Sequence, residues 1–225
     1  REEYEEKQKD SNQDDRIKRV EKEKVRNIVF LENHEVMTVY KYFMKEKRYR
    51  DATLLGLLYE SAGRKAEIAQ VMKDSVHEER NCTNMVRGKR GKQFRLLYFN
   101  LTQKAARLYL EERGEDLIPE LFITDHGEAA RSDTIYNWVV SWRKVFGELL
   151  GYEKKFNVHS FRHSALDNYS VGSHEVCRER KIKSISLDKL MKIANHSSVT
   201  TTQGYLQDRR QRELEELFHI RIEGI

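Results

Sequence analysis

Five short segments of this 225-residue sequence carry side chains that can bind or attack a phosphate group. Arg64 stands near the start of an expected helix, and the segment 88–92 reads Gly-Lys-Arg-Gly-Lys. The segment 159–163 places a histidine and an arginine three residues apart, on one face of a helix. Asn-His-Ser-Ser at 195–198 and Thr-Thr-Thr-Gln-Gly-Tyr at 200–205 complete the set. Arginine and lysine suit phosphate oxygens, and a tyrosine phenolate can be a nucleophile.

Each of these five signals, taken alone, has an ordinary structural explanation. Arg64 and Glu67 can form an ion pair at a helix start, and the segment 88–92 can be a solvated turn. A histidine and an arginine on one helix face are common on protein surfaces, and a single tyrosine is nearly always structural. Their meaning therefore depends on how they combine and on the elements that hold them.

The composition sets the class of protein in which these elements form. The chain has 42 Lys and Arg against 37 Asp and Glu, so its net charge of +5 agrees with a polyanionic partner without requiring one. No apolar run approaches the roughly 18 residues that a membrane span needs, and the start does not resemble a signal peptide. Cys82 and Cys177 make no disulfide framework, which predicts a cytoplasmic protein.

The first half of the chain divides into an arm, a helical part and a hairpin. Residues 1–27 are mostly charged and cannot bury a core, so we expect a charged linker or arm there and a globular domain over 28–225. Apolar residues recur at helical spacing from 36 to 58. Two short strands, 82–87 and 93–99, then flank the basic turn and predict a β-hairpin.

The second half is expected to be helical. Thr102 is a candidate N-cap for a helix that ends at Gly114, and Ser132 for a long helix that carries two tryptophans. Further helices are expected over 158–170, 187–195 and 200–208, followed by a terminal helix through Leu214, Leu217 and Phe218. The predicted fold class is therefore α+β, mainly helical, with one small antiparallel sheet.

The order of the five segments resembles that of the tyrosine site-specific recombinases, the family of phage integrases, Xer and Cre. The segment 61–67, Ser-Ala-Gly-Arg-Lys-Ala-Glu, resembles the family's T-G-x-R-x-x-E box, and 88–92 resembles its G-K-G-x-K hairpin. His-Ser-Phe-Arg-His at 159–163 resembles H-x-L-R-H. The last two segments resemble G-H-S-s and T-T-Q-x-Y, and His196 and Tyr205 have the family's usual separation of nine residues.

Three features depart from the family pattern. Asn195 stands where the family usually has glycine, and Phe161 where it has leucine. The stretch between Arg162 and His196 is longer than usual and carries a basic run, which we interpret as an enlarged loop. The family's N-terminal core-binding domain is absent, so we expect a catalytic domain with its linker.

The resemblance implies DNA strand cleavage and rejoining, as in integration or excision of a mobile element. In this reading Tyr205 attacks the phosphodiester and forms a 3′-phosphotyrosyl link, which leaves a free 5′ hydroxyl. Two guanidiniums and one imidazole bind the phosphate, and the remaining two groups move protons. The expected phosphate ligands are Arg64, Arg162 and His196; Lys89 is the expected acid for the 5′ oxygen, and His159 the base or its helper. Lys92 is expected to contact phosphate only.

The partners implied are double-stranded DNA and further copies of the chain, because strand exchange between two duplexes uses four protomers. The residues 214–218 could dock on a neighbouring copy or pack on their own domain. No cofactor is expected. His159 and His163 have the spacing of zinc ligands, but no carboxylate or cysteine pair accompanies them. The other histidines considered are expected to be exposed: His77, His126 and His174.

Two other functions fit the same residues. One is DNA relaxation similar to that of type IB topoisomerases, which share the active-site chemistry; sequence preference and a four-protomer assembly would argue against it. The other is a DNA-binding regulator with a decayed site, against which the complete set of six residues argues.

Overall fold

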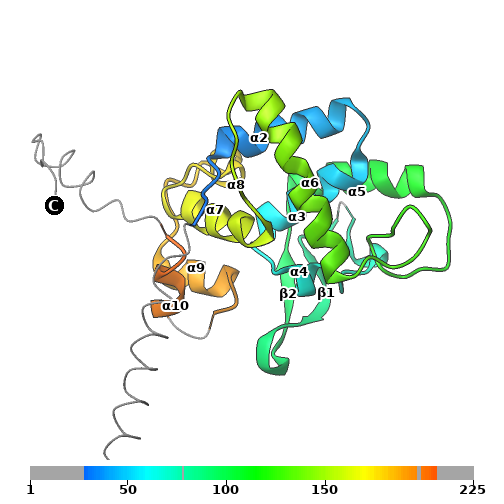
Figure 1. Ribbon diagram of the computed structural model, residues 1–225. Helices are drawn as coiled ribbons and strands as arrows, with labels where there is room; N and C mark the ends of the chain where they lie inside the picture. Colours follow the sequence, from blue (N-terminus) through cyan, green and yellow to red (C-terminus); the bar gives the residue numbers. More distant parts are fainter. Residues whose placement is uncertain (1–27, 78, 197–198, 207–225) are drawn as a thin grey trace, which may run out of the picture.

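The computed structural model describes residues 28–77, 79–196 and 199–206. The predicted arm over 1–27 and the terminal apolar residues 214–218 lie outside these ranges. Within them the chain is mainly helical with one two-stranded antiparallel sheet, which confirms the predicted fold class (Figure 1). No described helix is long and apolar enough to cross a membrane.

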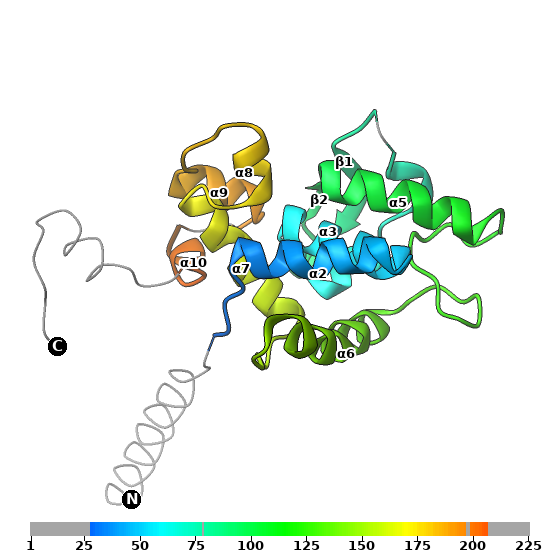
Figure 2. The same cartoon turned by 90° about the horizontal axis from the view of Figure 1, so that it is seen from above.

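The centre of the fold is α3 (Tyr49–Ser61), whose residues 51–61 are all buried. It packs against α2 (Asn33–Lys45), α5 (Asn100–Arg113) and α7 (Val158–Ser170), so neighbours on several sides account for its continuous apolar run. Figure 2 shows these helices gathered around it, with α6 (Ser132–Leu150) along one side. The helix α6 is amphipathic and buries one stripe: Ile135, Val139, Trp142 and Phe146.

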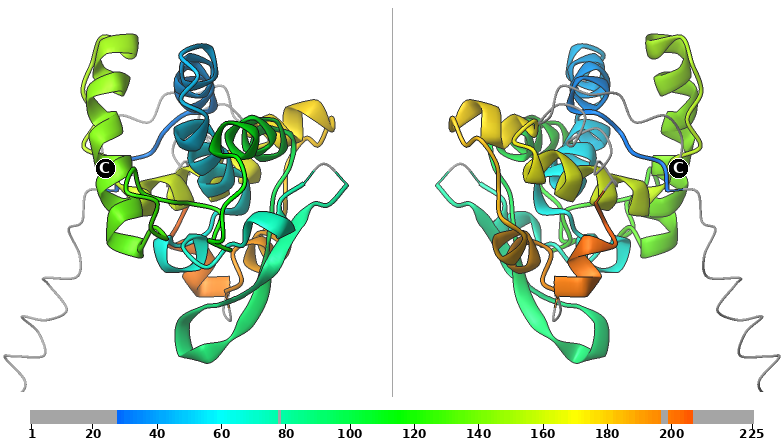
Figure 3. Two further views of the ribbon diagram at one scale, coloured as in Figure 1. Left: turned by 90° about the vertical axis from the view of Figure 1, so that its right-hand side faces the viewer. Right: turned by 90° about the vertical axis from the view of Figure 1, so that its left-hand side faces the viewer.

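The remaining helices are short. They are α4 (Lys65–Ile68), α8 (Glu175–Glu179), α9 (Leu187–Ile193) and α10 (Val199–Gln203), with the 3₁₀ turns η1 (Lys73–Ser75) and η2 (Lys89–Gly91). The hairpin consists of β1 (Cys82–Arg87) and β2 (Gln93–Leu97), paired from Arg87 with Gln93 to Cys82 with Leu97, with an irregularity between Cys82 and Met85. Its tip projects beyond the helical body on the side where α4, α9 and α10 gather (Figures 1 and 3).

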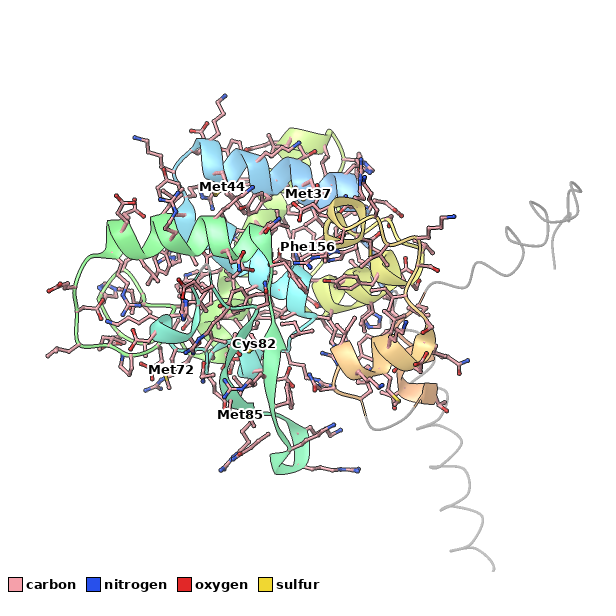
Figure 4. All side chains as sticks on the ribbon, turned by 180° about the vertical axis from the view of Figure 1, so that it is seen from behind. Met37, Met44, Met72, Cys82, Met85 and Phe156 are labelled. Carbon is pink, nitrogen blue, oxygen red and sulfur yellow. The ribbon has the colours of Figure 1, made fainter. Side chains whose placement is uncertain are left out.

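The hairpin alternates between buried and exposed residues, as a half-covered sheet should. Val86 and Leu96 face the core, whereas Met85 points outward (Figure 4). Figure 4 also shows Phe156, the fully buried residue just ahead of α7, deep among the helices. The predicted β1 bounds and the 158–170 helix are confirmed, whereas β2 ends two residues earlier than predicted.

Two predicted helix caps were wrong. Helix α5 begins at Asn100 rather than after Thr102, because a distant carboxylate supplies the cap. Glu60, at the end of α3, accepts hydrogen bonds from the backbone N–H groups of Phe99 (2.8 Å), Leu101 (2.9 Å) and Thr102 (3.2 Å). Burial raises the pKa of Glu60 to about 7. Helix α6 likewise starts one residue earlier than predicted: Arg131 is the N-cap, and Ser132 is the first residue of the helix.

The stretch between Arg162 and His196 was interpreted as an enlarged loop, which was wrong for α8: this helix buries Val176 and Cys177. Helix α9 lies where a helix was expected. His174 was expected to be exposed and is instead fully buried, stacked between the rings of Tyr59 (4.0 Å between centroids) and Tyr169 (3.7 Å). His77 and His126 are exposed as predicted.

Candidate active site

Arg162 is the buried centre of the site. It lies on α7, whose first turn is fixed by Asn157: the Asn157 side chain accepts from the N–H of His159 (2.8 Å) and of Ser160 (3.3 Å). The Arg162 guanidinium donates to the carbonyl oxygens of Ala62 and Ala194, the latter at 2.6 Å. These bonds tie α7 to the ends of α3 and α9. Within the described residues, the buried Nε of Arg162 has no hydrogen-bond partner.

Two residues with left-handed backbone shape the surroundings of Arg162. Ala62 ends α3 with φ 51°, and its carbonyl thereby faces Arg162. Asn195 follows α9 with φ 53° and directly precedes His196. Glycine is the residue that adopts this region without strain, and asparagine is tolerated better than most. The backbone therefore explains how Asn195 can replace the glycine of the recombinase pattern, and Ala62 occupies the glycine position of the T-G-x-R box.

His196 is held in one tautomer by two neighbours. Its Nε2 lies 2.6 Å from Nη2 of Arg162 and its Nδ1 lies 3.0 Å from Oγ1 of Thr202. Because a guanidinium only donates, Nε2 must accept, and the ring proton is therefore on Nδ1 and points at Thr202. Burial and the charge of Arg162 lower the pKa of His196 to about 3, so this imidazole is neutral at pH 7.

Tyr205 lies in a ring of cationic and imidazole groups. Its aromatic ring stacks on His163 with 4.2 Å between centroids, and the rings of His196 and His159 follow at 4.9 and 5.3 Å. The Arg162 guanidinium carbon is 5.2 Å from the Tyr205 ring centroid. A phenolate formed here would face this guanidinium, which is the surrounding that a tyrosine nucleophile needs.

Arg64 is presented from the start of α4 by a reciprocal pair with Glu67. The Arg64 N–H donates to one Glu67 oxygen and its Nη1 to the other, both at 2.8 Å. The charge of Arg64 acts on Arg162: burial and then this neighbouring charge lower the pKa of Arg162 to about 10. Two guanidiniums that repel one another favour a shared anion. They line a cavity of about 330 Å³ together with Tyr136, Val158 and His159.

The sequence matches the phage integrase family over residues 29–212. The chain belongs to the phage integrase family. Among curated proteins, none matches the sequence significantly.

Several solved structures share the fold of this chain. The XerA recombinase superimposes with a TM-score of 0.66 at 22% identity, covering 86% of this chain and 66% of the other. XerH bound to a palindromic difH substrate gives 0.62 at 19%, covering 85% and 53%. The Tn1549 transposon integrase with transposon right-end DNA gives 0.59 at 13%, covering 88% and 68%. The chain thus spans about half to two thirds of these proteins.

Five of the six predicted site residues of this integrase-family protein lie together, and Lys89 lies apart. Lys89 is exposed in η2, and its side chain shows no hydrogen bond or ion pair with any described residue. The residues just before this turn are nevertheless anchored beside the site. The Gln70 side chain bonds both backbone groups of Arg87, and a Cβ on Gly88 would lie 3.2 Å from Oε1 of Glu67.

Two residues of the cluster were not among the predicted site residues. His163 was considered only as a possible zinc ligand, although it stacks on Tyr205; its place in the His-x-x-Arg-His segment was the signal. Thr202 was noted only as part of the threonine run. Among the described residues, no group of three or more His, Cys, Asp or Glu could hold a metal ion.

Proposed function

We propose that this chain cleaves and rejoins duplex DNA at specific sites through a covalent 3′-phosphotyrosyl intermediate on Tyr205. The observation that carries the proposal is the placement of the Tyr205 ring against Arg162, His196 and His159, beside the cavity that Arg64 and Arg162 line. The family membership and the DNA complexes of XerH and the Tn1549 integrase support DNA as the substrate.

In the proposed reaction, Arg64 and Arg162 bind the non-bridging oxygens of the scissile phosphate, and the spare Nε of Arg162 is a further donor. The Tyr205 oxygen attacks phosphorus and gives its proton to His159. The bond from phosphorus to the 5′ oxygen breaks, and Lys89 protonates that oxygen. Attack of a 5′ hydroxyl on the phosphotyrosine reverses these steps and releases Tyr205.

His196 needs one rearrangement to act as predicted. In the structure its Nε2 accepts from Arg162, so it has no proton to donate to a phosphate from that atom. A phosphate that takes over the Nη2 donor of Arg162 would release Nε2, and its negative charge would favour protonation of the ring. We propose that substrate binding switches His196 from an acceptor to a donor.

The wider role that we propose is integration or excision of a mobile element by four protomers on two duplexes. The transposon integrase among the similar structures supports this role. The free thiols of Cys82 and Cys177 agree with action in the cytoplasm. The segment 214–218, which could join neighbouring protomers, lies outside the described residues.

The test of the nucleophile uses Tyr205→Phe and a nicked suicide substrate. The wild-type chain should give an SDS-resistant protein–DNA band, and the variant should bind the same DNA without forming one. A band from Tyr205→Phe would exclude Tyr205 as the nucleophile. Equal cleavage of unrelated duplexes by the wild type would favour relaxation of DNA over recombination.

The test of the acid uses a substrate whose bridging 5′ oxygen is replaced by sulfur, because a thiolate leaves without a proton. Lys89→Ala should cleave ordinary DNA about 10²- to 10⁴-fold more slowly and regain its rate on the sulfur substrate. Lys92→Ala is the matched control from the same turn and should lose little on either substrate. Rescue of Lys92→Ala alone would move the acid to position 92.

A further inference from the structure

The segment that leads into α2 is fixed to the helix that carries the active-site residues. The Leu31 N–H donates to Oγ of Ser164 at 2.7 Å, and the Asn168 side chain donates to the Leu31 carbonyl at 2.9 Å. The Lys154 ammonium, just ahead of α7, donates to the Phe30 carbonyl at 2.9 Å. Three hydrogen bonds on two consecutive residues therefore hold Phe30 and Leu31 against the middle and end of α7 and the segment ahead of it.

The Phe30 side chain continues this contact into the site. Its ring meets His163 edge to face, with 5.9 Å between centroids. His163 in turn stacks on Tyr205 at 4.2 Å, and its Nδ1 lies 3.3 Å from the Tyr205 carbonyl oxygen. Because a carbonyl only accepts, Nδ1 carries the proton of a neutral ring. His163 thus touches both the side chain and the backbone of the residue that we assign as nucleophile.

His163 needs this support because a cavity adjoins its otherwise buried side chain. A cavity of about 470 Å³ lies beside it, lined also by Ile28, Lys155 and His159. Phe30 is half-buried and packs on the His163 ring. Removal of the Phe30 ring would leave the imidazole room to rotate into the enlarged space, and the stacked Tyr205 ring would follow.

We propose that Phe30 is a positioning residue for Tyr205 that acts through His163. The inference rests on the proposed function, since it takes Tyr205 as the nucleophile. Phe30 contacts no reacting atom in this arrangement; it restricts the orientation of His163, which restricts that of the tyrosine. The segment 28–31 thereby restricts the orientation of the nucleophile.

The experiment measures covalent complex formation by the full chain in a single turnover at saturating DNA. Phe30→Ala should form the complex about 10-fold more slowly with an unchanged Kd, less than the ~10² that a 1 Å misplacement can cause. Phe30→Tyr, which keeps the ring edge, should stay within about twofold of wild type. Phe99→Ala removes another half-buried ring, packed on Arg180, and should leave the rate unchanged.

A double-mutant cycle separates positioning from general loss of stability. Once His163→Ala has removed the intermediary, adding Phe30→Ala should slow the reaction no further. An equal slowing in both backgrounds, or an unchanged Phe30→Ala rate, would overturn the inference. If Phe30→Ala does not fold, Phe30→Leu replaces it in the same double-mutant cycle. Failure of the wild type to form any covalent adduct would contradict the proposed function itself. If the wild type forms the adduct, the effect of Phe30→Ala tests only the positioning role.

Discussion

His174 should make the fold sensitive to acid, and the effect can be calculated. The imidazole is fully buried between Tyr59 and Tyr169. Its Nδ1 accepts from the Val176 N–H at 3.2 Å, and its Nε2 faces the Tyr59 carbonyl at 3.2 Å. The single proton of the neutral ring is therefore on Nε2. Burial lowers the pKa of His174 from 6.5 to about 3, because a second proton would have to enter an apolar space and displace the Val176 bond.

The sign of the pH dependence follows from this lowered pKa. Between about pH 6.5 and pH 3 the unfolded chain binds a proton at His174 and the folded chain does not, so stability falls as the pH falls. At pH 5 this group lowers the free energy of unfolding by about 2 kcal/mol relative to neutral pH. His163 and His196, with pKa values of about 4 and 3, act in the same direction. Glu60, with a pKa of about 7, acts in the opposite one.

Because these groups titrate over overlapping pH ranges, the assay compares variants rather than absolute stabilities. His174→Asn keeps an N-cap acceptor for α8 and removes the titrating ring. It should reduce the slope of unfolding free energy against pH by about 1.4 kcal/mol per unit between pH 6 and pH 4, measured by urea unfolding. The exposed His77→Asn is the control and should leave the slope unchanged. Parallel curves for wild type and His174→Asn would refute the reasoning, whatever the offset between them.

Two further predictions concern the residues that shape the site. Ala62→Gly should raise the free energy of unfolding by about 1 kcal/mol in a urea titration. An L residue with left-handed backbone costs roughly 1–2 kcal/mol, and the conformational entropy of glycine in the unfolded chain offsets only part of that gain. A loss of stability would show that the packing of the Ala62 side chain outweighs the backbone strain. Thr202→Ala should remove the partner of the His196 Nδ1 proton, lower unfolding free energy by about 1 kcal/mol and slow covalent complex formation more than it weakens DNA binding. Thr202→Ser should restore both, and equal rates for the alanine and serine variants would exclude a role for the hydroxyl.

The sequence alone predicted the parts of the site that local spacing encodes. The helix over 158–170 and the strand over 82–87 follow from short-range patterns of apolar residues and turn residues, and the structure confirms their bounds. The pairing of His159 with Arg162 on one helix is likewise a local property. The order of the five segments indicated the family, which the match over 29–212 establishes. The catalytic roles of the six residues remain predictions.

Only the tertiary structure decided what depends on residues far apart in the chain. The cap of α5 comes from Glu60, about 40 positions earlier, so a search for a local N-cap chose Thr102. His174 is buried because rings from α3 and α7 enclose it, and no residue near it in the sequence indicates this burial. Arg162 bonds to the Ala62 carbonyl across 100 positions, and this contact helps to place the guanidinium beside Arg64. Residue spacing encodes helix and strand periodicity, but partners brought together by packing leave no such period.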